Sequence, residues 1–289
     1  MKTRIKPDLM MGISMIIFGT IPLFVRNIAV TSAELALYRA VMAVILIGLF
    51  LLITGQKIPF RKIKKEVPLL FLSGVAIGIN WILLFEAYKY TTVSVATLCY
   101  YFAPVIVMVL SPLFFKEKPT ARQIFCFIMS TTGLVMLTDI GNSGINIGIL
   151  FGLGAAVFYA AAVFINKFIR NTDGIHRTFL QFISAVTVLF PYIFVSGDIS
   201  LGNLDGKGWI NLLTVGLVHT GITYCMYFSS LKELPGQKAA ILSYLDPLVA
   251  VFISVTVLGE TITTVQIIGG LLILGFTLID GFSINKKQT

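Results

Sequence analysis

Long apolar runs separated by short polar segments make up most of this chain of 289 residues. A helix needs about 20 mostly apolar residues to cross the hydrocarbon core of a bilayer. A window of that length predicts about ten membrane-spanning helices. They are expected at residues 8–26, 34–54, 68–89, 92–115, 121–139, 146–168, 177–196, 209–231, 237–258 and 264–283. The chain is therefore predicted to be an all-α integral membrane protein.

The composition agrees with this prediction. Hydrophobic residues make up 57% of the chain and charged residues 12%, and the mean hydropathy is +0.93. A soluble globular protein carries about a quarter charged residues, so this chain cannot cover its surface with polar groups and is expected to contact lipid. The net charge of +9 does not indicate nucleic-acid binding, because the basic residues lie between apolar runs and not on one soluble face.

The basic residues are distributed unequally between the two sides of the predicted bundle. When the N-terminus is placed inside, all but four of the 22 Lys and Arg residues fall on inner segments. The exceptions are Arg39, which lies within a span, and the outer residues Arg26, Lys89 and Lys207. The positive-inside rule then predicts a multi-pass protein of the cell membrane with both termini in the cytoplasm.

The chain contains an internal repeat. The third to fifth predicted spans match the eighth to tenth at an offset of 143 residues. The matches are Lys89 with Lys232, Ala96 with Ala239, Tyr101 with Tyr244, Pro104 with Pro247, Glu117 with Glu260 and Gln123 with Gln266. We therefore predict two five-helix repeats, at residues 1–139 and 146–283. Because five is odd, the second repeat is inverted in the membrane.

Inverted five-helix repeats are the arrangement of many secondary transporters, which bind their substrate near the bilayer midplane between the two halves. The sequence thus predicts a central cavity and transport by alternating access. A gene duplication that serves folding alone is the other interpretation of the same repeat.

Two matching segments carry a family resemblance. They read ATLCYYFAPVIVMVLSPLFFKE at 96–117 and AAILSYLDPLVAVFISVTVLGE at 239–260, and a Gly-containing span follows each. On these segments the chain resembles the drug/metabolite transporter superfamily, EamA type, over nearly its full length. The resemblance implies ten helices, a central cavity and a small organic solute as cargo, often an exported amino acid or other metabolite.

Asp246 and Pro247 lie side by side near the middle of the ninth predicted span. A carboxylate at that depth costs a few kcal/mol unless it faces a wet cavity, finds a partner or is protonated. The repeat counterpart of Pro247 is Pro104, whereas that of Asp246 is Ala103. We therefore interpret the proline as an architectural kink and Asp246 as a candidate for substrate binding or coupling. An acid that caps a backbone amide or pairs with a neighbouring helix is the alternative.

His219 lies near the midplane of the eighth predicted span. Because histidine can change its charge near neutral pH, His219 and Asp246 at similar depth are candidates for a proton site. A lone histidine in an apolar helix is more often a hydrogen-bonded packing residue, and this alternative stays open.

Arg39 and Glu86 are predicted to lie at similar depth on the outer side, in the second and third spans. Such a pair could gate the outer mouth or hold the carboxylate and ammonium groups of a zwitterion. The alternative is that Glu86 pairs with Lys89 three residues along the same helix.

Aromatic and amide side chains gather at the predicted midplane. The candidates for lining a binding site are Asn80, Trp81, Tyr101, Tyr224 and Tyr244. This lining suits amphipathic solutes, and together with Asp246 it could hold an organic cation by cation–π contact. For any single tyrosine, packing or an interfacial belt is the alternative.

The sequence contains no phosphate-binding loop of the type G-x-x-x-x-G-K-[ST]. We therefore expect the energy for transport to come from a proton gradient or from the gradient of the solute. An integral-membrane enzyme and a channel are alternatives from other classes. Because the acids, histidines and three cysteines lack metal-ligand spacing, no enzyme activity, cofactor or metal is expected. Export is favoured over uptake of a polar or cationic nutrient, and either a monomer or a homodimer would fit.

Overall fold

The structure, a computed structural model, describes residues 6–115, 120–138, 146–172, 174–196, 199–231, 233–234 and 242–285, and over these residues it contains helices and no strand. The helices are α1 (Pro7–Gly19), α2 (Ile21–Val25), α3 (Ser32–Ile53), α4 (Phe60–Ile63), η1 (Lys64–Glu66), α5 (Val67–Tyr90), α6 (Val93–Tyr100), α7 (Ala103–Phe115), α8 (Ala121–Thr138), α10 (Ile147–Phe168), α11 (Gly174–Ser196), η2 (Leu201–Asn203), α12 (Gly206–Leu213), η3 (Thr214–Ile222), α13 (Thr223–Leu231), α15 (Leu245–Thr256) and α16 (Thr264–Asn285).

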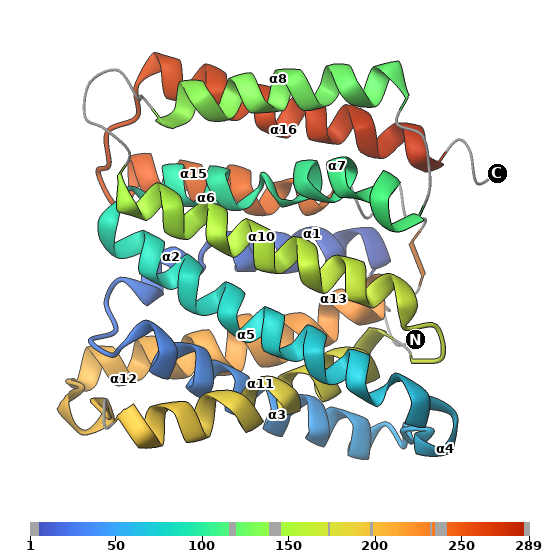
Figure 1. The fold of residues 1–289 in the computed structure, drawn as a ribbon. Coiled ribbons are helices and arrows are strands. Elements are labelled where there is room, and N and C mark those ends of the chain that lie inside the picture. The colour runs from blue at the N-terminus through green and yellow to red at the C-terminus, as the bar shows by residue number, and fades with distance from the viewer. Residues whose placement is uncertain are drawn as a thin grey trace.

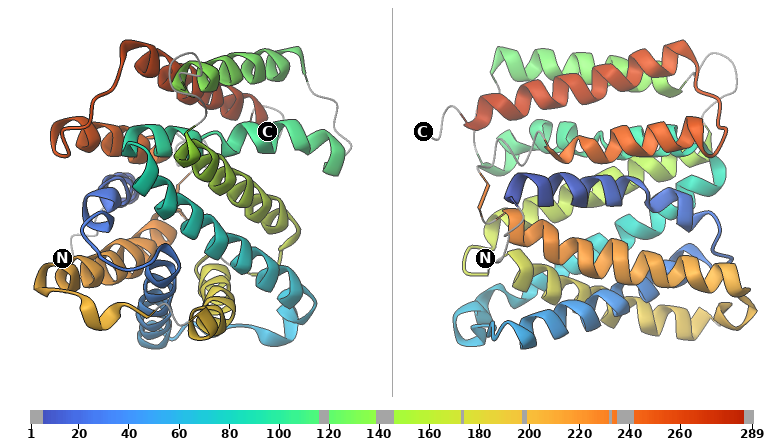
Figure 2. Two further views of the ribbon diagram at one scale, coloured as in Figure 1. Left: turned by 60° about the vertical axis from the view of Figure 1, so that its left-hand side comes forward. Right: turned by 180° about the vertical axis from the view of Figure 1, so that it is seen from behind.

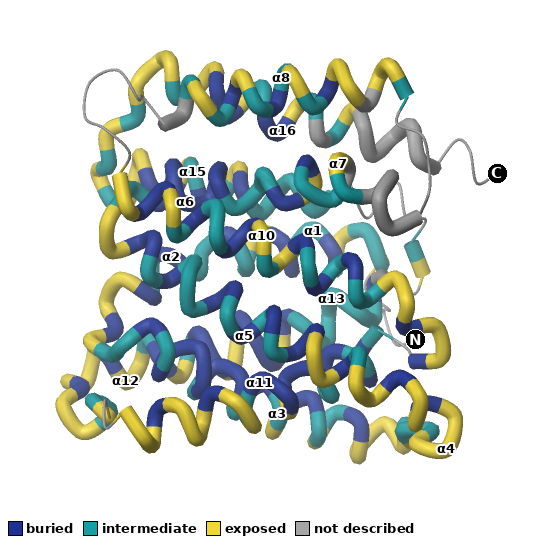
Figure 3. The backbone as a smooth tube through the Cα atoms, viewed as in Figure 1, coloured by how far each residue is buried: buried dark blue, intermediate teal, exposed yellow. Residues whose placement is uncertain are grey.

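The apolar helices fit the predicted spans. Those long and apolar enough to cross a membrane are Pro7–Val25, Ser32–Ile53, Phe60–Tyr90, Ile147–Phe168, Gly174–Ser196 and Gly206–Ser230. Shorter apolar helices at the remaining predicted positions are Val93–Val107, Ile124–Met136, Leu245–Thr256 and Thr264–Phe276. Exposed positions recur along the outer helices (Figure 3). Many of the exposed side chains are large and apolar, such as Phe194 and Val195. The chain is therefore a multi-pass membrane protein, and the total of ten spans stays a prediction.

The helices are stacked in layers and run roughly side by side (Figure 1). At one edge α8 packs on α16, and below them α6 packs on α15. In the middle α5 packs on α10 and α11, and α1 lies between α13 and α15, as the view from behind shows (Figure 2). The largest buried apolar cluster lies in the lower half, where α3, α5, α11 and η3 meet. Because α4 and α12 lie at opposite ends of the bundle (Figure 1), these are called the α4 end and the α12 end.

Two of the apolar segments, which are repeat counterparts, are broken in the middle. The chain turns at 101–102 between α6 and α7, and at Tyr244 before α15. Pro104 and Pro247 therefore lie in the first turns of α7 and α15, where proline has the right backbone angle and its missing N–H has no helical partner to lose. The predicted proline kink is thus corrected: the break precedes the proline, and the proline belongs to the new helix.

Buried carboxylates tie loops to distant helices at both ends of the bundle. At the α4 end, Glu66 accepts hydrogen bonds from the backbone N–H groups of Arg170 and Asn171, at 2.8 and 3.0 Å. At the α12 end, Glu34 accepts from the backbone N–H of Ser200 at 2.7 Å. Each carboxylate satisfies backbone donors that have no helical partner, so it fixes where a connection crosses the end of the bundle.

We expect replacement of Glu66 by alanine to lower the apparent melting temperature of the purified protein. The change also removes the acceptor for the hydroxyl of Thr172 at 2.9 Å. Each buried donor left unpaired costs about 1–3 kcal/mol, so the free energy of unfolding should fall by several kcal/mol. The control is Glu86→Ala, because the Glu86 side chain is 24% exposed. Equal melting shifts for the two variants would contradict the structural role of Glu66.

Glycines bring two pairs of helices into close contact. A Cβ on Gly74 would lie 2.3 Å from the carbonyl oxygen of Gln181. If position 74 held any other residue, α5 and α11 could not lie as close together as they do. A Cβ on Gly19 would lie 2.6 Å from the carbonyl oxygen of Asp246. Gly19 thereby allows α1 to lie against the first turn of α15.

Candidate functional site

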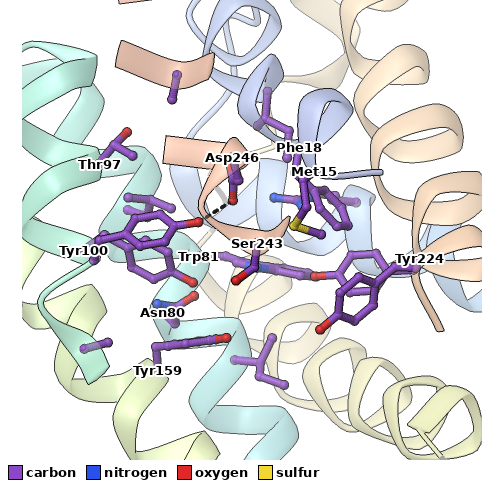
Figure 4. A pocket seen from close by; sticks show the side chains of 18 of the residues that line it. Met15, Phe18, Asn80, Trp81, Thr97, Tyr100, Tyr159, Tyr224, Ser243 and Asp246 are labelled. Carbon is purple, nitrogen blue, oxygen red and sulfur yellow. Dashed lines mark hydrogen bonds between the residues drawn. The ribbon is translucent and has the colours of Figure 1, made fainter. Parts of the chain in front are cut away.

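A cavity of about 440 Å³ lies inside the bundle, between α1–α3, α5–α7, α10, α11, α13 and α15. Its volume is within the range of small-molecule binding sites, about 300–1,000 Å³. The predicted site residues that line it are Arg39, Asn80, Trp81, Tyr101, Tyr224, Tyr244 and Asp246. Figure 4 shows aromatic side chains from several helices pointing into this space around Asp246. Seven of the nine candidate residues therefore line one cavity.

Asp246 lies in the first turn of α15 and faces the cavity. Its Oδ2 accepts a hydrogen bond from Oη of Tyr101 at 2.7 Å, drawn as the dashed line in Figure 4. Tyr101 is the residue at which α6 ends. The bond therefore joins the two broken helices across the cavity, and the positive end of the α15 dipole favours the carboxylate in this position.

Arg39 is the cation of the cavity wall. Its side chain is buried, its Nε donates to Oγ1 of Thr220 at 2.7 Å, and its guanidinium carbon lies 4.4 Å from the centroid of the Trp81 ring. A second ring, that of Phe85, is 5.5 Å away. No ion pair of Arg39 occurs within the described residues. The arginine is thus held by stacking and by one neutral hydrogen bond, and its charge is not neutralised by a carboxylate.

The aromatic lining contains two groups of contacting rings. The rings of Trp81 and Phe182 are 5.1 Å apart, and those of Phe182 and Tyr224 are 5.2 Å apart and edge to face. On the other side Tyr100 contacts both Tyr101 and Tyr159, with centroids 5.5 and 5.3 Å apart. Such packing fixes the ring orientations, so the apolar wall is preformed.

Polar residues that the sequence did not single out complete the lining. Gln181 donates from Nε2 to Ser73 Oγ and to Asn166 Oδ1, both at 2.7 Å. Asn80, which was predicted, donates to the carbonyl of Ala155 at 2.7 Å. Gln181 is the approximate repeat counterpart of Arg39, so applying the repeat to each candidate would have found it.

The structure does not bring His219 into the cavity or to Asp246. The histidine is buried between η3 and the α1–α2 junction, where its Nδ1 donates to the carbonyl of Thr214 at 3.1 Å. Its Nε2 lies 2.8 Å from Oγ1 of Thr20. Both ring nitrogens therefore have local partners, and the predicted His–Asp proton site is replaced by the packing alternative.

Arg39 and Glu86 do not form the predicted pair. Glu86 accepts from the hydroxyl of Ser32 at 2.5 Å and forms an ion pair with Lys89 at 3.0 Å. It does not line the central cavity, whereas Arg39 does. Glu86 contacts Ser32, the first residue of α3, whereas Arg39 lies about two turns further along that helix and stacks on Trp81. The alternative pairing of Glu86 with Lys89 along its own helix is the one observed.

A second cavity, of about 310 Å³, lies at the α12 end. Phe85 and Tyr88 line both cavities, so their side chains stand between them. Beside it Arg26 forms an ion pair with Glu260 and donates to the carbonyl of Tyr88 at 3.2 Å, while Glu260 accepts from the backbone N–H of Val93 at 2.8 Å. These contacts hold the ends of α2, α5 and α6 and the chain after α15 together, and they close the bundle at the α12 end.

We expect replacement of Glu260 by glutamine to make the central cavity more accessible from the α12 end. The amide keeps an acceptor for Val93 but loses the ion pair with Arg26. The measurement is the labelling rate of a Leu84→Cys reporter in a cysteine-free background, with a thiol reagent that does not cross the membrane.

The labelling rate should rise about fivefold or more, because a charge-assisted contact is worth at least about 1 kcal/mol. Lys89→Gln is the matched control, since the Lys89–Glu86 pair lies within one helix. An unchanged rate in Glu260→Gln would show that the ion pair does not restrict access.

Comparisons with known proteins agree with the fold and the cavity. Residues 5–139 and 146–279 each match the EamA-like transporter family. An uncharacterized transporter of Bacillus subtilis (strain 168), YxxF, is 31% identical over 90% of this chain and 86% of its own length. A probable amino-acid metabolite efflux pump of Salmonella typhimurium is 25% identical over 85% of this chain and 87% of its own.

A solved crystal structure supports the same architecture. It superposes with a TM-score of 0.64 over 94% of this chain and 97% of that chain, at 17% sequence identity, which shows a shared fold. With both halves matched, the multi-pass helices in place and an aromatic cavity between them, the chain belongs to the EamA-like transporter family.

Proposed function

We propose that this transporter is a secondary carrier that exports a small organic solute, an amino acid or a related metabolite, by alternating access. In this proposal the chain forms ten spans as two inverted repeats, residues 1–139 and 146–283, and the solute binds in the central cavity. Inverted repeats supply two equivalent gating arrangements around one fixed site.

The observation that carries the proposal is the symmetry of the cavity lining. Positions 143 residues apart repeatedly face the same space. The pairs are Trp81 with Tyr224, Leu84 with Tyr227, Phe85 with Phe228, Tyr100 with Ser243, Tyr101 with Tyr244 and Ala103 with Asp246. A duplication that served folding alone would not need to place equivalent residues around a shared cavity.

The contacts between helices also repeat when each helix is replaced by its counterpart in the other half. Under the repeat, α1, α3, α5, α7 and α8 correspond to α10, α11, η3–α13, α15 and α16. The contact of α5 with α10 corresponds to that of α13 with α1, that of α5 with α11 to that of η3 with α3, and that of α7 with α10 to that of α15 with α1. This correspondence supports two halves that can exchange inward and outward arrangements.

The proposed orientation rests on the charge asymmetry of the bundle, and the proposed direction of transport on the name of a relative. The first turn of α1, the α4 helix and the end of α16 lie at the same end (Figure 1). The excess of Lys and Arg on that side supports a cytoplasmic location for it and for both termini. The name of the Salmonella relative supports export of an amino-acid metabolite. Uptake of a polar or cationic nutrient is the alternative, favoured by the acid in the cavity.

Counterflow and gradient-driven flux in proteoliposomes test the proposal. The panel contains labelled amino acids and quaternary amines, each with and without a proton gradient. Saturable exchange of an amino acid is the expected result. Saturable exchange of quaternary amines alone would favour the uptake alternative, and flux without saturation or counterflow would indicate a channel and overturn the carrier proposal.

A further inference from the structure

The central cavity carries two charged side chains of opposite sign. Among its described lining residues, Arg39 and Asp246 are charged, and the rest are apolar, aromatic or neutral polar. They come from α3 and α15, one from each half of the chain. No ion pair between them occurs within the described residues. Each charge therefore faces the same space without neutralising the other directly.

Arg39 has unused hydrogen-bonding capacity. A guanidinium has five N–H donors, and only Nε of Arg39 is engaged, by Thr220. Neither Nη atom has a hydrogen-bond partner in the described part of the chain. Neither belongs to the described side-chain polar atoms that are fully buried without a partner. Stacking on Trp81 holds the plane of the group in place. Two free, parallel donors in a fixed plane are the arrangement that a carboxylate binds most strongly.

Asp246 is placed to bind a positively charged group. Oδ2 accepts from Tyr101, and Oδ1 has no hydrogen-bond partner among the described residues. The rings of Tyr100 and Tyr101 line the cavity beside it. A carboxylate with a free oxygen next to aromatic rings suits an ammonium group, which gains a charge-assisted hydrogen bond and cation–π attraction.

We propose that the cavity binds a zwitterion, with the carboxylate of the solute on Arg39, its ammonium group on Asp246, and its remaining part against the ring wall of Trp81, Phe182 and Tyr224. This inference rests on the proposed function, because it names the class of solute for the same cavity. A simple organic cation would leave Arg39 unpaired and be repelled by it, and a simple anion would leave Asp246 unpaired. A buried charge without a partner is unfavourable, so only a solute with both charges satisfies the whole site.

The test is ligand binding to the purified full-length protein, measured by calorimetry and by ligand-induced thermal stabilisation. The first probes are the free amino acids as a panel. The tightest of them is then compared with its amide, which lacks the carboxylate, and with its deaminated acid, which lacks the ammonium group. For phenylalanine these are phenylalaninamide and hydrocinnamate, and for leucine they are leucinamide and isocaproate.

Wild-type protein should prefer the zwitterion over either analogue by about tenfold or more, as expected for one charge-assisted contact. Arg39→Gln should lose the preference over the amide and keep the preference over the deaminated acid. Asp246→Asn should show the reverse pattern. Arg39→Lys should recover part of the preference over the amide, which separates a lost charge from a misfolded protein. Glu86→Gln and Lys89→Gln remove one charge of each sign outside this cavity and should keep both preferences.

The proposal is overturned if no amino acid binds, if the analogues bind as tightly as the zwitterion, or if the two variants lose both preferences equally. Its failure differs from failure of the carrier proposal. Selective zwitterion binding without counterflow would contradict the carrier proposal and support the roles proposed for Arg39 and Asp246. Counterflow of a quaternary amine that is insensitive to Arg39→Gln would keep the carrier and overturn the charge pair.

Discussion

Asp246→Asn is expected to lose most solute flux while the protein still folds. The asparagine Oδ1 can still accept the hydrogen bond from Tyr101, which in the structure ends on Asp246 at 2.7 Å. What disappears is the negative charge in the cavity. A hydrogen bond to a charged group is worth about 1.5–3 kcal/mol, so kcat/KM for counterflow should fall about tenfold to a hundredfold. Initial rates in proteoliposomes, normalised to the amount of inserted protein, measure this.

The matched variant is Tyr101→Phe, which removes the hydrogen bond and retains the charge. It should reduce flux only a few-fold, because the carboxylate stays in the first turn of α15. Full flux in Asp246→Asn would mean that the acid serves the start of that helix and not the solute. The site would then be centred on Arg39.

Gly74→Ala is expected to destabilise the bundle strongly. The added Cβ would meet the carbonyl oxygen of Gln181 at 2.3 Å and Cβ of Ser184 at 2.7 Å. A backbone oxygen cannot rotate away as a side chain can, so α5 and α11 must separate. Overpacking of this kind costs about 1–3 kcal/mol, and the value should fall at the upper end of the range. The measurements are the yield of monodisperse protein and its apparent melting temperature.

Gly78→Ala, one turn further along α5, is the control for helix propensity and for general tolerance. A Cβ there would be 3.5 Å from the side chains of Ala185 and Leu189, which is ordinary van der Waals contact. Its melting temperature should stay close to that of the wild type or rise. If both alanine variants behaved alike, close backbone contact between α5 and α11 would not be what Gly74 provides.

In the proposed mechanism, the broken helices connect the central cavity to the α12 end. Tyr101 lies at the break between α6 and α7, and Asp246 follows the counterpart break at Tyr244, in the first turn of α15. At the α12 end the same two segments meet again, where Glu260, in the chain after α15, binds the first turn of α6 and Arg26. In the proposed mechanism, a solute that changes the contact at the breaks acts through α6 and α15 on the contacts of Glu260 at the α12 end. This linkage is what the proposed mechanism requires.

The sequence by itself was sufficient for the class of fold. Apolar length and the placement of turn residues are local properties, so the helices appear where the pattern predicts them. The repeat could also be recognised in the sequence, because its two copies keep the same residue types at a constant spacing. Together with their depth, these properties led to Asp246, Trp81 and Tyr224 as candidates for one site.

Only the tertiary structure decided which side chains meet. Sequence position gives the depth of a residue along its helix, but each step also turns the side chain by about 100° around the helix axis. Arg39 and Glu86 were predicted at similar depth, yet Arg39 meets Thr220 and the cavity, and Glu86 meets Ser32 and Lys89. Likewise His219 is at the expected level but packs against Thr20.

The contacts that close the α12 end were invisible in the sequence for the same reason. Glu260 and Val93 are 167 residues apart, and their meeting depends on how α6 and α15 pack. Helix rotation and packing are set by the sum of many weak contacts over the whole bundle, to which each residue contributes little. The sequence therefore determined the membrane helices, the repeat and the kind of chemistry at the midplane, and the packing of those helices decided which charges face the cavity and which hold its ends.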